Sequence, residues 1–216
     1  MLMEKERQEI VYYGKQLLEK GLTTGSGGNL SIYNRDKGLM AISPTGIPYF
    51  EMKKEDVVIM DLEGKIIDGN RYPSSEHEMH AIVYRNRQEL NAMVHTHSIF
   101  AATISALNQP LPAVDYLVAI GGGKDVKCAK YATYGSEALA INALEAMEGR
   151  NAVLLANHGM NACSTDLKKA MNVAEQLEFC SEIYVRAKSM GEKINIIDDE
   201  EMIRNVKKFV TYGVQK

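Results

Sequence analysis

Apolar side chains recur every three or four residues in several segments of the chain, which is the spacing of one face of an α-helix. Near the start the apolar positions are Ile10, Val11, Leu17 and Leu18. Gly21 follows them, and glycine after the last periodic residue is typical of a helix C-terminus, so the opening helix is predicted to end near Lys20. The same periodicity after Asp166 predicts a long amphipathic helix that ends at Gly191, and Asp199 is predicted to cap a last helix.

Short apolar runs bounded by Gly, Pro, Asn and Ser predict strands between these helices. The runs are residues 30–33, 39–42, 57–60, 65–67, 92–97 and 152–156. Glu63-Gly64 separates the third run from the fourth and predicts a hairpin. A helix is predicted to begin at about Ser75, which has capping-box spacing to Glu78, and Ser98 is predicted to cap another. This mixture of strands and helices predicts an α/β fold.

Composition and charge exclude several classes of protein. The 216 residues carry 25 Lys and Arg against 28 Asp and Glu, a net charge of −3, so we expect no nucleic-acid binding by bulk electrostatics. The longest uncharged stretch, residues 98–114, contains two prolines, so no membrane span is predicted. The charged start of the chain does not resemble a secretory signal. Three cysteines, an odd number, predict reduced thiols in a cytoplasmic protein.

Three histidines and one glutamate suggest a metal site. His95 and His97 are two residues apart in a predicted strand, so their side chains point to the same side. His158 follows an apolar strand, and Glu76 lies at a predicted helix start. Each has a simpler explanation alone: a solvated strand face, a turn histidine, or an acidic residue that complements a helix dipole. Together, three imidazoles leave a tetrahedral zinc one open position, the arrangement of a catalytic site.

Glycine- and serine-rich loops suggest a second component of the site. Their backbone N–H groups and hydroxyls are the parts from which a phosphate site is built. No nucleotide-binding glycine fingerprint is present, which argues against a nucleotide. An oxygenase of the cupin type usually has Glu soon after its His-x-His, but residues 98–136 contain none. A carbonic-anhydrase-like site leaves these loops without a purpose. The residues concerned are Gly28, Asn29, Thr45, Gly46, Ser74 and Ser75.

The chain resembles the class II aldolase family through a series of motifs in order. They are Gly25-Ser-Gly-Gly-Asn-Leu-Ser31, Ser43-Pro-Thr-Gly-Ile-Pro-Tyr49, Pro73-Ser-Ser-Glu76, Val94-His-Thr-His97, Tyr131-Ala-Thr-Tyr-Gly135, Asn157-His-Gly159 and Thr211-Tyr-Gly213. The resemblance implies a single domain over residues 1–216, an α/β fold with a largely antiparallel central sheet flanked by helices. It also implies one zinc ion per subunit and a homotetramer with sites at subunit interfaces.

The resemblance also assigns residue roles. His95, His97 and His158 would hold zinc, and Glu76 would ligate the resting ion and then act as proton donor and acceptor. The loop residues named above would hold the substrate phosphate. Tyr116 and Tyr212 would assist near the aldehyde end of the substrate, with Tyr212 reaching the neighbouring subunit's site. Tyr134 stands where related enzymes carry Phe, so the substrate pocket is expected to be narrower or more polar.

The implied reaction is zinc-dependent retro-aldol cleavage of a ketose 1-phosphate, a small-molecule sugar phosphate, to dihydroxyacetone phosphate and a short aldehyde. The charge left beside the carbonyl needs Lewis-acid stabilisation, so no Schiff-base lysine is required. L-fuculose 1-phosphate, which gives L-lactaldehyde, is the best single substrate, and 5-deoxyribulose 1-phosphate follows it.

Two other functions occur in similar proteins. L-ribulose-5-phosphate 4-epimerases place Asp where Glu76 stands and usually insert residues before the third histidine. A non-enzymatic scaffold of the adducin-head kind shares the fold without the metal ligands. All three histidines and Glu76 are present here, which favours an aldolase.

Overall fold

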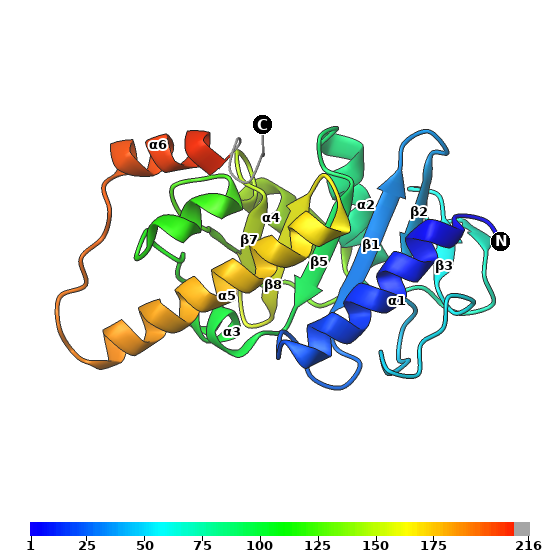
Figure 1. Ribbon diagram of the computed structural model, residues 1–216, viewed down its shortest axis with the longest axis horizontal. Coiled ribbons are helices and arrows are strands. Elements are labelled where there is room, and N and C mark those ends of the chain that lie inside the picture. The colour runs from blue at the N-terminus through cyan, green and yellow to red at the C-terminus, as the bar shows by residue number, and fades with distance from the viewer. Residues whose placement is uncertain (210–216) are drawn as a thin grey trace, which may run out of the picture.

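The computed structural model describes residues 1–209, in which eight strands form a single sheet (Figure 1). Their order is β4-β3-β2-β1-β5-β8-β7-β6. Among them only β6 and β7 pair in parallel, so the predicted α/β fold with a largely antiparallel sheet is confirmed. The strands are β1 (Asn29–Asn34), β2 (Leu39–Ile42), β3 (Val58–Met60), β4 (Ile66–Asp68), β5 (Ala92–Thr96), β6 (Cys128–Ala129), β7 (Ala152–Leu155) and β8 (Gly159–Ser164).

Helices cover both faces of the sheet, and each face has its own hydrophobic core. One face packs against α1 (Glu4–Glu19), α3 (Ile99–Ala106), the 3-10 helix η1 (Tyr116–Gly121), α5 (Leu167–Ser189) and α6 (Asp199–Phe209). The other packs against α2 (His77–Asn86) and α4 (Glu137–Ala146). In Figure 1, α1 and α5 cross in front of the strands. No helix within residues 1–209 is both long enough and apolar enough to span a bilayer.

Strand β5 shows how side-chain alternation directs residues to these two cores. Ala92 and Val94 lie in the core under α1 and α5, and Met93 lies in the core under α2 and α4. Because successive side chains point to opposite faces, His95 lies on the same face as Met93. The strand therefore delivers His95 toward the N-terminal end of α2.

Several predicted boundaries are confirmed. Helix α1 ends at Glu19, and Gly21 follows it with a left-handed φ of +66°. The side chain of Asp166 caps α5 by accepting a hydrogen bond from the N–H of Lys169 at 2.8 Å. Strands β3 and β4 form the predicted antiparallel hairpin. Asp199 was predicted to cap the last helix, but α6 begins at Asp199 itself and the cap is Asp198, whose Oδ1 accepts a hydrogen bond from Glu201 N at 2.9 Å. Residues within each segment were therefore enough to predict these helix ends and the hairpin to within about one residue.

One serine cap was predicted wrongly, and the other is in the predicted place without a capping bond. Helix α2 begins at His77 with Glu76, not Ser75, at its N-cap, and the Glu76 side chain accepts no capping hydrogen bond from the backbone of the described helix. Ser98 occupies the N-cap of α3, but its side chain does not cap the helix among residues 1–209. The carboxylate of Glu178, in α5, instead accepts hydrogen bonds from Phe100 N and Ala101 N, both at 2.9 Å. A side chain far along the sequence thus satisfies the free N–H groups of α3.

Strands β6 and β8 were not predicted. The sequence of β8, Gly-Met-Asn-Ala-Cys-Ser, has no strong strand pattern, yet it lies between β5 and β7 and is almost entirely buried. Asn157, with a left-handed φ of +55°, turns the chain from β7 into β8. A Cβ at Gly159 would collide with Thr96 O, so glycine is required for β8 to approach β5. Pairing with its neighbours, rather than local propensity, makes β8 a strand.

Candidate active site

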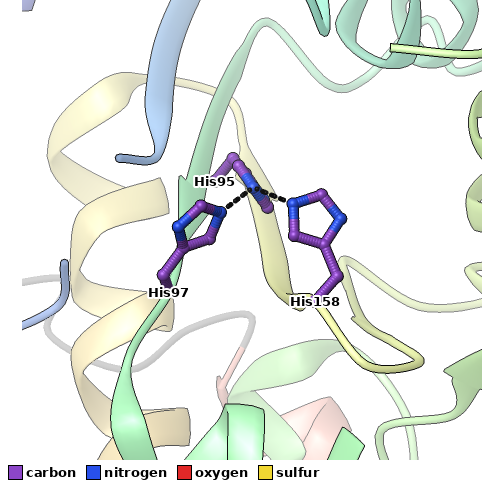
Figure 2. A group of neighbouring side chains, drawn as sticks. All are labelled: His95, His97 and His158. Carbon is purple, nitrogen blue, oxygen red and sulfur yellow. Dashed lines mark hydrogen bonds between the residues drawn. The ribbon is translucent and has the colours of Figure 1, made fainter. Parts of the chain in front are cut away.

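Three imidazole rings converge on one point beside the end of β5 (Figure 2). His95 Nε2 lies 2.9 Å from His97 Nε2 and 3.2 Å from His158 Nε2. His97 follows the last residue of β5, and its N–H donates to Leu22 O at 3.0 Å, which holds the chain in place there. His158 comes from the turn between β7 and β8. The predicted histidine cluster is therefore assembled from two segments that are about 60 residues apart in the sequence.

The converging nitrogen of His95 is a lone-pair acceptor. Asn161, a buried residue of β8, accepts a hydrogen bond from His95 Nδ1 at 2.8 Å, which leaves His95 Nε2 without a hydrogen in the neutral ring. Burial lowers the pKa of His95 well below its ordinary value and lowers the pKa of His97, with His158 a further cause in both. The His95 and His97 rings are thus held in the neutral form that binds a metal.

The Glu76 carboxylate completes the donor set. Its Oε2 lies 3.4 Å from His95 Nε2 and its Oε1 lies 3.4 Å from His158 Nε2. Glu76 is 7% exposed, and its buried Oε1 has no hydrogen-bond partner among the described residues. A buried carboxylate oxygen without a partner is costly unless a cation neutralises it. Three imidazole nitrogens and one carboxylate oxygen fit zinc, for which ligand nitrogens about 3.3 Å apart are expected from ordinary Zn–N bond lengths.

The predicted phosphate-binding loops line the same cavity as the metal cluster. The cavity has a volume of about 380 Å³. It is lined by Glu76, His97 and His158 and by every predicted loop residue: Gly28, Asn29, Thr45, Gly46, Ser74 and Ser75. Tyr134 lines it as well. The structure therefore brings together a metal donor set and a group of backbone N–H groups and hydroxyls, side by side.

Backbone geometry explains why these loops meet. Gly28 has a φ of +70°, and a Cβ there would lie 2.6 Å from His95 O, so only glycine lets this loop approach β5 closely. Ser74 N donates to Ser43 O at 3.0 Å, and Thr45 N donates to Tyr72 O at 3.1 Å. These bonds tie the loop that carries Thr45 to the loop that carries Ser74, and both residues line the cavity.

Sequence reasoning missed several residues of the site. Ser26, Tyr131 and Asn157 also line the cavity, although no role was predicted for them. Tyr131 and Tyr134 line the cavity and are nevertheless 64% and 70% exposed, so they form its rim. Their common motif and the Asn-His-Gly turn could have suggested Tyr131 and Asn157. Asn161 gave no signal because β8 itself was not predicted.

Two predicted residues are not brought to this cavity. Tyr116 is 53% exposed in η1, is not among the described residues that line the cavity, and stacks on Phe209 with ring centroids 6.3 Å apart. Tyr212 lies outside the described residues. The roles of both tyrosines stay predictions.

The site has the donor set of a metal-dependent enzyme, and comparison with known proteins assigns the chain to a family. Residues 8–185 match the family described as Class II Aldolase and Adducin N-terminal domain, so the chain belongs to the class II aldolase family. It is 53% identical over 215 residues to a 5-deoxy-D-ribulose 1-phosphate aldolase of Bacillus thuringiensis serovar kurstaki, with 100% of both chains covered. It is 39% identical over 208 residues to an L-fuculose phosphate aldolase of Haemophilus influenzae, covering 96% of this chain and 95% of the relative.

A solved structure supports the same assignment. An L-fuculose 1-phosphate aldolase superposes with a TM-score of 0.94 at 48% identity, over 97% of this chain and 98% of the other. The resemblance inferred from the motifs is therefore confirmed, and so is the prediction that the chain is an enzyme, an aldolase that breaks a carbon–carbon bond.

Proposed function

We propose that the protein cleaves a ketose 1-phosphate to dihydroxyacetone phosphate and a short aldehyde, with one zinc ion per subunit. The observation that carries this proposal is Glu76 Oε1, which has no hydrogen-bond partner within residues 1–209 and is buried beside three converging imidazoles in the cavity that the phosphate-binding loops line. A phosphate group in those loops would place the adjoining carbons of the substrate near the histidine cluster.

Each part of the cavity has a role in this proposal. His95, His97 and His158 hold zinc, which supplies Lewis-acid stabilisation of the negative charge that develops during cleavage. Backbone N–H groups at Gly28 and Gly46 and the hydroxyls of Thr45, Ser74 and Ser75 bind the phosphate, and Asn29 contributes its amide. Glu76 gives a proton to the carbon that keeps the electrons of the broken C–C bond, and it takes that proton back in the reverse, condensation direction. The proton of the hydroxyl that becomes the aldehyde goes to a tyrosine at the aldehyde end. Tyr134 contacts the aldehyde half of the substrate.

Two substrates are supported about equally. L-fuculose 1-phosphate is the substrate suggested by the motifs and by the name of the superposed structure. The relative that is 53% identical over the whole chain is a 5-deoxy-D-ribulose 1-phosphate aldolase, which favours 5-deoxyribulose 1-phosphate. The two substrates share the dihydroxyacetone phosphate half and differ only in the aldehyde. Because one methyl or hydroxyl group changes selectivity by only about 10 to 200-fold in an apolar pocket, we propose that both react.

A substrate panel tests this function. The purified enzyme is expected to release dihydroxyacetone phosphate from both ketose 1-phosphates, and elemental analysis is expected to find about one zinc per subunit. Values of kcat/KM across the panel would rank the aldehydes. Epimerisation of L-ribulose 5-phosphate without any release of dihydroxyacetone phosphate would instead identify an epimerase, and absence of metal and of turnover would indicate the scaffold.

We place the working site between subunits of a homotetramer. Tyr116 is half exposed in the single chain and stands against the end of α6, which leads into the segment that carries Tyr212. Both tyrosines could then serve the aldehyde end of a site in an adjoining subunit. Light scattering is expected to give four times the 24.0 kDa mass of the chain. A monomeric and fully active enzyme would contradict this arrangement.

We also place the protein in the cytoplasm. Cys128, Cys163 and Cys180 form no disulfide in the part of the chain that the structure describes. Burial raises the pKa of the Cys163 and Cys180 thiols to about 12, so both stay protonated and unreactive at neutral pH. A compartment that keeps thiols reduced suits this chain.

A further inference from the structure

A row of buried polar side chains leads away from the cavity between β1 and α2. It begins at Asn29, whose Nδ2 donates to Glu76 Oε2 at 2.9 Å. Asn29 Oδ1 lies 2.5 Å from His80 Nε2, and His80 Nδ1 lies 2.6 Å from Ser31 Oγ. Ser31 Oγ in turn lies 2.6 Å from the hydroxyl of Tyr84. His80 and Ser31 are 0% exposed, so water does not compete for these bonds.

The repeat distances of strand and helix explain the row. Two residues along a strand advance about 6.7 Å, and four residues along a helix advance about 6 Å. Asn29 and Ser31 of β1 therefore alternate in space with Glu76, His80 and Tyr84, which follow each other at intervals of four along α2. The two elements interleave their polar side chains on one line that ends at the Glu76 carboxylate.

Every hydrogen bond in this row is donated in the same direction, toward Glu76. The Glu76 carboxylate only accepts, so the NH₂ group of Asn29 faces it, and Asn29 Oδ1 must face His80. His80 Nε2 is then the donor of that bond, and His80 Nδ1 accepts from the Ser31 hydroxyl. Burial lowers the pKa of His80 to about 3, so the ring carries one N–H as this pattern requires. Tyr84 then donates to Ser31.

An inverted Asn29 amide would break two of these bonds. Its oxygen would face the Glu76 carboxylate, and its NH₂ group would face the N–H of His80. We propose that His80, oriented by Ser31, is a positioning residue that fixes the Asn29 amide so that it holds Glu76 and presents an N–H toward the bound phosphate. This inference rests on the proposed function, because it assigns His80 to the roles of Asn29 and Glu76.

Paired variants of His80 test the inference. His80→Leu removes both ring nitrogens at similar volume and is expected to lower kcat/KM at least tenfold, with kcat reduced and KM raised. His80→Gln, whose amide can still donate to Asn29 Oδ1, is expected to recover most of the loss. Zinc content is expected to stay near one per subunit in both variants. Ser181→Ala is the matched control, because it also removes a buried hydrogen bond, from Ser181 Oγ to Leu177 O at 2.7 Å, but in α5.

A double-mutant cycle separates positioning from stability. In an Asn29→Ala background, His80→Leu is expected to change kcat/KM less than twofold, since the group through which it acts is gone. An equal loss with and without Asn29, or a lowered Tm with unchanged kinetics in His80→Leu, would overturn the inference. The wild-type enzyme in the same assay tests the proposed function separately. If the wild-type enzyme shows no turnover, the affinity of the zinc-loaded protein for inorganic phosphate is measured in place of kcat/KM. His80→Leu is then expected to weaken phosphate binding, His80→Gln to restore most of it, and His80→Leu to have little effect in the Asn29→Ala background.

Discussion

Glu76→Gln is expected to lower kcat for ketose 1-phosphate cleavage at least about 100-fold while the protein keeps most of its zinc. A glutamine has the shape of the glutamate, and its carbonyl oxygen can still accept the hydrogen bond from Asn29 Nδ2. It cannot take up a proton in the neutral pH range, so the proton transfer to and from the reacting carbon is lost. Steady-state kinetics at saturating substrate, with elemental analysis of the same samples, measures both quantities.

Ser75→Ala is the comparison for that variant. Ser75 lines the cavity among the phosphate-binding loops, so loss of its hydroxyl is expected mainly to raise KM. The pair therefore separates chemistry from binding. A Glu76→Gln enzyme with wild-type kcat would show that the carboxylate takes no part in proton transfer, whatever Ser75→Ala does.

His158→Ala is expected to lose most of the bound zinc and, with it, most of the aldolase activity. Two imidazoles and one carboxylate remain, and the ion loses a ligand from a set in which three nitrogens converge. His158 is the best first choice because it lies partly exposed in the turn between β7 and β8, so its replacement leaves the sheet intact. His95 is fully buried in β5, where a substitution also disturbs the core.

His95→Ala and His97→Ala complete the test of the metal site. Each variant is expected to show reduced zinc by elemental analysis and reduced cleavage of ketose 1-phosphate. Circular dichroism would verify that the fold is retained. Full metal content and full activity in all three alanine variants would reject the metal-site assignment.

The sequence contained enough local information for most helices and for the candidate site. His95 and His97 could be identified because two residues along a strand place both rings on one side, and the loop glycines because their conformations favour Gly. The strand assigned to them ends at Thr96, but the hydrogen bond from His97 N to Leu22 O keeps the second ring beside the first. The three histidines and Glu76 could be considered together from their residue types, but the separate roles of metal ligand and proton carrier came from the resemblance to a family.

The features that could not be predicted depend on contacts between distant segments. Strand β8 is defined by pairing with β5 and β7, and Asn161 orients His95 only because that pairing exists. Glu178 caps α3 across 77 and 78 residues of sequence. The hydrogen-bonded row from Asn29 to Tyr84 forms only because β1 and α2 pack together in one particular position along their lengths. No periodicity within one segment carries that information.

The ends of the sheet limit how subunits can associate. One edge is β4, with three residues, and the other is β6, with two. Edges this short expose few unpaired backbone groups, so a neighbouring chain gains little by adding a strand there. Assembly through a continuous intersubunit sheet is therefore disfavoured, and so is aggregation of that kind. In the proposed tetramer, contacts between copies would then fall to helices and loops, and the loop that carries Tyr131 and Tyr134 at the rim of the cavity is among them.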